Sequence, residues 1–305
     1  MMTSLPVENL ADLGDVHRAG EVASTPIQPV IQHPGTCARQ DEHMSNPDAI
    51  NVTNASLLNV TGGVATVTLN RPDNRNALST VLVESLAAHL HEALDRDDVR
   101  VVVLTGAGTT FCAGADLKER RTVVAAAGEL PTFVKVFQMI RASSKPVVAK
   151  LNGHALAGGL GLACSCDISI APERAMFGFT EVRIGVAPAI ISVVCLPKLR
   201  AADAAELFLT GERIGARRAA EVGLINRAVP DNQLDAVTDE LVAKLLLGAP
   251  KAMAATKQLL QQVQRMDEGA AFAWTAKLSG ELFASDEASE GMSAFAAKRP
   301  AVWTL

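Results

Sequence analysis

One stretch decides the fold: Lys150-Leu-Asn-Gly-His-Ala-Leu-Ala-Gly-Gly-Leu-Gly-Leu-Ala-Cys-Ser-Cys-Asp167. The apolar run 146–151 predicts a β-strand, Asn152-Gly153 predicts a turn, and Gly158-Gly159 stands where a helical pattern begins. Glycine lets a ligand approach the main chain, and a helix N-terminus leaves unpaired N–H groups with a partial positive charge. A carbonyl oxygen beside the Gly158 N–H would therefore be stabilised as negative charge develops on it. Close packing of a helix on a sheet through small residues is the alternative explanation.

A second stretch repeats this order of a buried-type strand, a glycine-punctuated loop and the start of a helix: Val101-Val-Val-Leu-Thr-Gly-Ala-Gly-Thr-Thr-Phe-Cys-Ala-Gly-Ala-Asp-Leu-Lys-Glu119. Two such loops can face one oxygen. With both loops present, the chain resembles the crotonase superfamily, also called the enoyl-CoA hydratase/isomerase family. Its hallmarks are a Phe-x-Ala-Gly-x-Asp-Leu loop and an Asn-Gly-x-Ala-x-x-Gly-Gly loop, and the resemblance runs in order from about residue 55 to about residue 300.

Composition excludes several other classes of protein. The formal net charge is −5, and no basic stripe with interleaved aromatic residues predicts a nucleic-acid or anionic-membrane surface. No apolar run approaches the roughly 20 residues that span a bilayer. The five cysteines are too few and too irregular for a disulfide framework, which predicts a reduced, cytoplasmic setting with Cys164 and Cys166 as small core residues. The histidines form no metal-ligand pattern, so we expect no metal.

The pattern along the chain predicts an α/β fold with a helical end. Residues 1–50 lack periodicity and predict a disordered arm, 51–231 a β/α core, and 232–305 a helical C-terminal subdomain. The resemblance implies a crotonase-type spiral of ββα repeats, whose C-terminal helices build a homotrimer or a dimer of trimers. Periodicity predicts strands at 64–69, 101–104, 147–151, 168–171 and 225–229, a helix with Val83, Leu86, Leu90 and Leu94 on one face, and helices at 234–247, 252–265 and 270–283.

The resemblance also implies the binding site. The substrate is an acyl-CoA thioester, no separate cofactor is needed because coenzyme A enters with the substrate, and the thioester oxygen is held by the backbone N–H groups of Ala115 and Gly158. Alternative roles are solvated surface positions for the lysines and helix N-capping for Asp116, which we favour for its side chain. The residues implied in coenzyme A binding are Arg71, Arg75, Asn76, Ala77, Ala113, Asp116, Leu117, Lys118 and Lys298.

One position departs from the family pattern. Hydratases of the family place a Glu three residues after the oxyanion glycine and a second Glu in a later Phe-Gly-x-x-Glu segment, but here the first is Gly161 and only the second, Glu181, is present. Hydration needs a water held on one side and a proton delivered on the other, which two carboxylates share. The chain therefore predicts an enoyl-CoA hydratase-like enzyme with Glu181 as its single acid/base. An isomerase using Glu181 alone and a noncatalytic acyl-CoA-binding protein remain as alternatives.

The residues around Glu181 and at position 161 lead to two further expectations. Apolar residues flank Glu181, so burial should raise its carboxyl pKa, whereas the alternative is an exposed carboxylate paired with Arg183 or Arg200. A Gly161→Glu substitution should restore the second carboxylate if the position has room.

The chain contains neither the Gly-x-Ser-x-Gly of serine hydrolases nor a complete Gly-x-Gly-x-x-Gly, and His154 without a partner predicts a packed residue.

Overall fold

The computed structural model describes residues 54–119 and 130–304, so the predicted N-terminal arm lies outside the described residues. The strands are β1 (Ser56–Thr61), β2 (Val64–Leu69), β3 (Val101–Gly106), β4 (Thr110–Cys112), β5 (Val147–Lys150), β6 (His154–Leu156), β7 (Ile168–Pro172), β8 (Met176–Gly178), β9 (Ile214–Gly215) and β10 (Arg227–Val229). The helices are α1 (Thr80–Asp95), α2 (Thr132–Ala142), α3 (Gly158–Ser165), α4 (Ala189–Cys195), α5 (Ala201–Thr210), α6 (Ala216–Glu221), α7 (Leu234–Leu246), α8 (Pro250–Gln262), α9 (Glu268–Phe283) and α10 (Asp286–Ala296). Short 3₁₀ helices are η2 (Pro72–Asn74), η3 (Thr180–Ile184), η4 (Leu196–Lys198), η5 (Asp231–Gln233) and η6 (Val263–Arg265).

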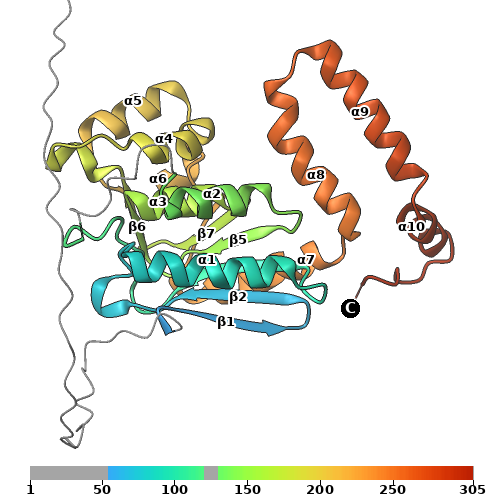
Figure 1. Ribbon diagram of the computed structural model, residues 1–305, viewed down its shortest axis with the longest axis horizontal. Coiled ribbons are helices and arrows are strands. Elements are labelled where there is room, and N and C mark those ends of the chain that lie inside the picture. Colours follow the sequence, from blue (N-terminus) through green and yellow to red (C-terminus); the bar gives the residue numbers. More distant parts are fainter. Residues whose placement is uncertain (1–53, 120–129, 305) are drawn as a thin grey trace, which may run out of the picture. The chain divides into compact units, whose positions relative to one another are not determined.

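Two sheets organise these elements (Figure 1). The larger sheet has the order β1-β2-β3-β5-β7-β10, in which β1 and β2 are antiparallel and the remaining pairs are parallel. The smaller sheet has the order β4-β6-β8-β9, with β4, β6 and β8 parallel and β9 antiparallel to β8. Three consecutive pairs, β3 with β4, β5 with β6 and β7 with β8, each send one strand to each sheet before a helix follows. This is the spiral of ββα repeats that the resemblance predicted.

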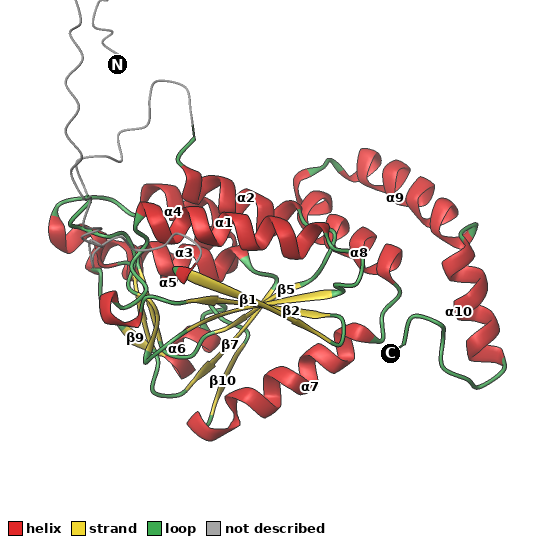
Figure 2. Ribbon diagram, turned by 60° about the horizontal axis from the view of Figure 1, so that its bottom comes forward, coloured by secondary structure: helices red, strands yellow, loops and turns green. Residues whose placement is uncertain are grey.

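Helices cover both faces of the larger sheet (Figure 2). Strand β3 shows why, because its first four residues are all buried and alternate between two cores. Val102 and Leu104 join the larger core with Leu82, Leu86 and Leu90 of α1, whereas Val101 and Val103 join a second cluster with residues of α7. The helix predicted from the spacing of Val83, Leu86, Leu90 and Leu94 is α1, capped by the Ser79 side chain, which accepts from Leu82 N.

A buried ion pair fixes α8 to the core. The Lys257 ammonium lies 2.8 Å from Asp167 Oδ2 and donates to the carbonyl oxygens of Ile140 and Lys145 at 3.0 and 2.9 Å. Asp167 Oδ2 also accepts from Val147 N, so the end of α3, the start of β5 and α8 meet at one carboxylate. The predicted helices 234–247, 252–265 and 270–283 correspond to α7, α8 with η6, and α9, and a further helix, α10, follows.

The described cysteines, Cys164 and Cys166 among them, are free and buried. Their interpretation as small core residues is confirmed, while the cytoplasmic location that the cysteine pattern suggested stays a prediction. Among the residues described, none of the helices combines the length and apolarity that crossing a membrane requires.

Candidate active site

Three functional groups follow the carboxyl ends of three neighbouring parallel strands. Ala115 comes three residues after β4, Gly158 two residues after β6, and Glu181 three residues after β8. Strand β6 pairs with β4 on one side and with β8 on the other. Ala155 of β6 lies opposite Cys112 of β4 and Phe177 of β8. Carboxyl ends of parallel strands meet at one edge of a sheet. The fold therefore gathers two backbone N–H groups and one carboxyl group at that edge.

The backbone N–H groups of Ala115 and Gly158 lie close together. Leu78 forms a parallel bridge to Ala115, in which Leu78 N donates to Gly114 O at 2.8 Å and Asp116 N donates to Leu78 O at 3.4 Å. In such a bridge the central residue's own N–H points away from the partner strand. An ideal Cβ built on Gly158 would lie 3.6 Å from Ala115 N. Within the described residues neither N–H has an acceptor, so both can donate to one ligand oxygen.

The backbone before α3 is strained. Ala157, the N-cap of α3, has φ 48° and ψ −124°, a combination that costs an L-residue on the order of 1–3 kcal/mol. Its N–H donates to Gly178 O at 3.0 Å, which ties the start of α3 to the strand that leads to Glu181. Gly159 permits this geometry, because a Cβ there would lie 2.3 Å from Cys112 O. The glycine pair therefore serves both close packing and access to the Gly158 N–H.

Glu181 is a half-buried residue on η3. Its Oε2 atom is buried and has no hydrogen-bond partner among the described residues. Burial raises the pKa of the Glu181 carboxyl above its usual value. The alternative partners are bonded elsewhere, since Arg183 Nε donates to Thr210 O and Arg200 Nε to Asp203 Oδ2. A desolvated carboxyl group with a raised pKa suits proton transfer near neutral pH.

This raised pKa predicts how stability changes with pH. The native state holds the Glu181 proton more tightly than the unfolded chain, so stability falls as pH rises from the ordinary value of 4.5 to the raised native pKa. Glu181→Gln cannot titrate and should lose less unfolding free energy over that window than the wild type. Urea unfolding of both proteins at pH 4 and pH 8 measures the difference. A larger loss in the variant would show that Glu181 is not desolvated.

Gly161 is enclosed by apolar side chains. A Cβ built on it would lie 2.4 Å from Ile191 Cγ2 and 3.1 Å from Phe137 Cζ. Ile191 comes from α4 and Phe137 from α2, and both are buried. The condition set for Gly161→Glu, that the position has room, is therefore not met, because apolar side chains already crowd the place of a Cβ at this residue. The sequence could not reveal this, since the three residues come from separate helices.

A cleft of about 640 Å³ lies beside the Ala115 loop. Of the residues implied in coenzyme A binding, Arg71, Asp116 and Lys118 line it. Asp116 Oδ2 accepts from Asn74 Nδ2 at 2.7 Å, so the two walls of the cleft are joined. Asn74 lies within the range over which the chain resembles the family, but neither hallmark loop contains it. Asp116 Oδ1 accepts from Lys118 N at 3.0 Å across a turn, and any helix beyond residue 119 lies outside the described residues.

The other implied residues are placed differently. Asn76 is fully buried, and its side chain donates to Ala107 O and Thr110 O and accepts from Arg71 N, so it shapes the loop. Lys298 follows α10 and is not among the residues lining the cleft. His154 Nδ1 accepts from Met176 N at 3.0 Å, which agrees with its interpretation as a packed residue. The remaining implied residues that do not line the cleft are Arg75, Ala77, Ala113 and Leu117.

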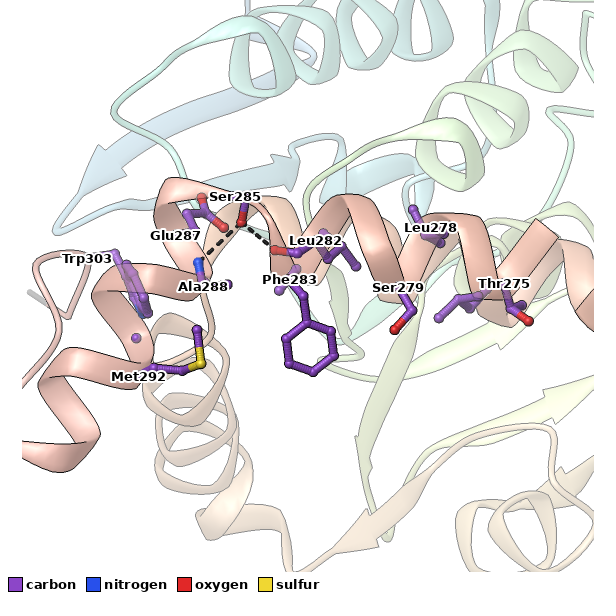
Figure 3. A pocket seen from close by; sticks show the side chains of 14 residues that line it. Thr275, Leu278, Ser279, Leu282, Phe283, Ser285, Glu287, Ala288, Met292 and Trp303 are labelled. Atoms are coloured by element: carbon purple, nitrogen blue, oxygen red, sulfur yellow. Dashed lines mark hydrogen bonds between the residues drawn. The ribbon is translucent and has the colours of Figure 1, made fainter. Parts of the chain in front are cut away.

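A separate apolar cavity of about 600 Å³ lies between α8, α9 and α10 (Figure 3). Phe283 of α9, Met292 of α10 and Trp303 contribute to its wall. None of Ala115, Gly158 and Glu181 lines it. It is therefore distinct from the edge where the N–H groups and the carboxyl meet.

Comparisons with known proteins agree with this geometry. The family model for enoyl-CoA hydratase/isomerase matches residues 59–305. The short-chain-enoyl-CoA hydratase of Clostridium acetobutylicum is 34% identical over 250 residues, which is 81% of this chain and 96% of that protein. The 2,3-dehydroadipyl-CoA hydratase of Escherichia coli is 35% identical over 237 residues, covering 77% of this chain and 93% of that protein.

Solved structures share the fold. The crystal structure of enoyl-CoA hydratase from Bacillus anthracis has a TM-score of 0.75 and 32% identity, covering 82% of this chain and 98% of that one. The family model spans the loops of Ala115 and Gly158, the segment of Glu181 and the helical C-terminal part. The chain belongs to the enoyl-CoA hydratase/isomerase family, the crotonase superfamily.

Proposed function

We propose that this enzyme moves the double bond of an unsaturated acyl-CoA thioester, with Glu181 carrying the proton between two carbons. One observation carries the proposal: among the described residues Glu181 has a buried carboxyl oxygen without a partner, and at residue 161 Ile191 and Phe137 crowd the place of a Cβ. A double-bond shift needs one group that removes a proton and returns it. Hydration needs in addition a held and activated water.

The proposed reaction begins with the thioester oxygen between Ala115 N–H and Gly158 N–H. The Glu181 carboxylate removes a proton from the α-carbon of a 3-enoyl thioester, and the C–H electron pair forms an enolate whose negative oxygen the two N–H groups stabilise. A lost donor of this kind typically costs ~3–4 kcal/mol of transition-state stabilisation. The enolate then collapses, the double bond moves into conjugation, and the γ-carbon takes the proton back from Glu181.

Coenzyme A binding is assigned to the cleft beside Ala115. Arg71 and Lys118 supply positive charge there, and Arg71 is held by a 2.8 Å hydrogen bond from its guanidinium to Ser79 Oγ. Such charges suit the phosphates of coenzyme A. Asp116 follows Ala115 directly, so a ligand in this cleft lies next to one of the two oxyanion donors. Lys298 does not line this cleft, and its role in binding phosphates is proposed for the cleft of a neighbouring copy of the chain.

Hydration is the second candidate, because the names of the relatives favour it. Two curated relatives are named as enoyl-CoA hydratases of short-chain and 2,3-dehydroadipyl substrates. A hydratase built on this chain would have to hold its water by a group other than a residue 161 carboxylate. A protein that binds acyl-CoA without turnover is the third possibility, since half of the acid/base pair is missing.

Two four-carbon substrates separate these possibilities. The proposal predicts that but-3-enoyl-CoA is converted to but-2-enoyl-CoA with a larger kcat/KM than but-2-enoyl-CoA is hydrated to 3-hydroxybutanoyl-CoA. Product analysis by chromatography and mass spectrometry measures both reactions. Preferred formation of the hydroxy product would establish the hydratase instead. Tight binding of both thioesters with no product would establish the binding protein.

We also propose assembly into a homotrimer or a dimer of trimers. Helix α9 buries none of its residues within the described chain, and Phe272 and Phe283 on it are 68% and 71% exposed. A large exposed apolar face on a helix marks an interaction surface. Sedimentation at micromolar concentration should give the mass of three or six chains, and Phe272→Glu should lower it. A wild-type monomer would contradict this assembly.

A further inference from the structure

The C-terminal turn of α5 packs against the segment that carries Glu181. Strands β8 and β9 pair Phe177 with Ile214, which brings residues 179–183 beside residues 208–212. The rings of Phe179 and Phe208 have centroids 4.0 Å apart. In addition, Arg183 Nε donates to Thr210 O at 3.2 Å. Contacts on both sides of Glu181 thus come from the end of α5.

Gly211 lies at the centre of this contact. It ends α5 with φ +60°, in the left-handed region that glycine adopts without a steric penalty. A Cβ at this position would lie 2.8 Å from Val182 Cγ2, 3.2 Å from Arg183 Cγ and 3.2 Å from Phe179 O. These three atoms belong to the segment that surrounds Glu181, and the last is backbone. A side chain at residue 211 would therefore meet this segment at less than an ordinary contact distance, so the segment has to give way.

We propose that Gly211 is a positioning residue for Glu181. Because it has no side chain, η3 sits against the end of α5, and this contact keeps the Glu181 carboxyl desolvated and aimed at the edge that holds the two N–H groups. Displacing η3 admits water to Oε2 and moves the proton acceptor relative to the thioester. The inference rests on Glu181 being the proton carrier of the proposed function.

The test uses Gly211→Ala with Gly62→Ala as its matched control. Gly62 has a similar φ of +56°, but an added Cβ there meets nothing within 4 Å. Both variants carry the same backbone strain, and only the first displaces η3. For but-3-enoyl-CoA, Gly211→Ala should lower kcat by up to about 10²-fold, the effect of misplacing a catalytic group by about 1 Å, with KM little changed. Its apparent pKa in the kcat/KM profile should fall as Glu181 becomes hydrated.

Two further variants separate the contact from the backbone conformation. Asn tolerates the left-handed region but has a Cβ, so Gly211→Asn should be as impaired as Gly211→Ala. Val182→Ala removes the Cγ2 atom that a new Cβ meets at 2.8 Å, so the Val182→Ala/Gly211→Ala double variant should recover part of the lost kcat. The proposal would be overturned by a fully active Gly211→Asn. It would also be overturned by a double variant whose fold-loss in kcat exceeds the product of the fold-losses of the two single variants.

A direct measurement of the Glu181 pKa tests the positioning role of Gly211 independently of enzyme turnover. Infrared difference titration, with Glu181→Gln identifying the carboxyl band, measures the Glu181 pKa directly in each variant. Gly211→Ala should lower that pKa and Gly62→Ala should leave it unchanged. An unchanged pKa in Gly211→Ala would refute the positioning role even if Glu181 is the proton carrier. A lowered pKa with a fully active Glu181→Gln would instead remove the proposed function and leave the structural contact standing.

Discussion

Glu181→Gln should lower the turnover of an enoyl-CoA by roughly 10²–10⁴-fold, the contribution of a positioned general acid/base. Glutamine keeps the size and the hydrogen-bonding capacity of glutamate but cannot accept and return a proton at neutral pH. Oε2 of Glu181 has no hydrogen-bond partner within the described residues, so the substitution breaks no hydrogen bond of that atom. Thioester affinity should therefore stay nearly constant. Steady-state kinetics together with calorimetric titration measure the two effects.

Glu206→Gln is the matched control for this change. Glu206 is an exposed carboxylate on α5, so its replacement removes the same charge from the protein without touching the site. Turnover of this variant should equal that of the wild type. If Glu181→Gln retained full turnover, the acid/base would have to be a different group.

Gly161→Glu should lower the free energy of unfolding by roughly 3–5 kcal/mol, which is the range for an uncompensated buried charge. Its Cβ alone would meet Ile191 Cγ2 at 2.4 Å, and the carboxylate beyond would enter the apolar space that Ile191 and Phe137 occupy. Urea unfolding measures the loss. The variant should show no gain in hydration of but-2-enoyl-CoA, because the helix must distort before the carboxylate reaches a substrate.

Ala205→Glu controls for placing a glutamate on a helix outside the proposed assembly face. Ala205 lies on α5 and is exposed, so this variant should change the free energy of unfolding by no more than roughly 0.5 kcal/mol. Adding Ile191→Ala to Gly161→Glu opens space and should recover part of the lost stability. A stable Gly161→Glu single variant that hydrates but-2-enoyl-CoA efficiently would contradict the packing account.

Most of the backbone geometry of the Ala115 and Gly158 loops could be predicted from sequence because it is local. The loops at Ala115 and Gly158 each consist of a strand, a turn and a helix start or tight bend within a few residues, and glycine marks the positions where the backbone must approach closely. Strand β3 and helix α1 follow from their apolar periodicity. Glu181 could be singled out because the family motif fixes its spacing from Phe177.

The rest depends on contacts that periodicity does not encode. Strands β4, β6, β8 and β9 have two or three residues, too few for an alternating pattern, yet they bring Glu181 to the oxyanion loops. The crowding at Gly161 involves Ile191 and Phe137 from other helices, so only three-dimensional packing reveals it. In the same way Asn76 was implied in coenzyme A binding, but its side chain joins its own loop to the backbone from the end of β3 to the start of β4.

In the proposed reaction the carboxyl group of Glu181 removes and returns the same proton. This transfer is tested most directly with but-3-enoyl-CoA carrying deuterium at the α-carbon, converted in ordinary water, with deuterium at the γ-carbon of the but-2-enoyl-CoA product measured by NMR. Because Glu181 Oε2 is buried away from water, the label should be delivered before it exchanges, and a measurable share of the product should carry it. Product that carries only solvent hydrogen at the γ-carbon would show that two different groups handle the protons and would contradict the account.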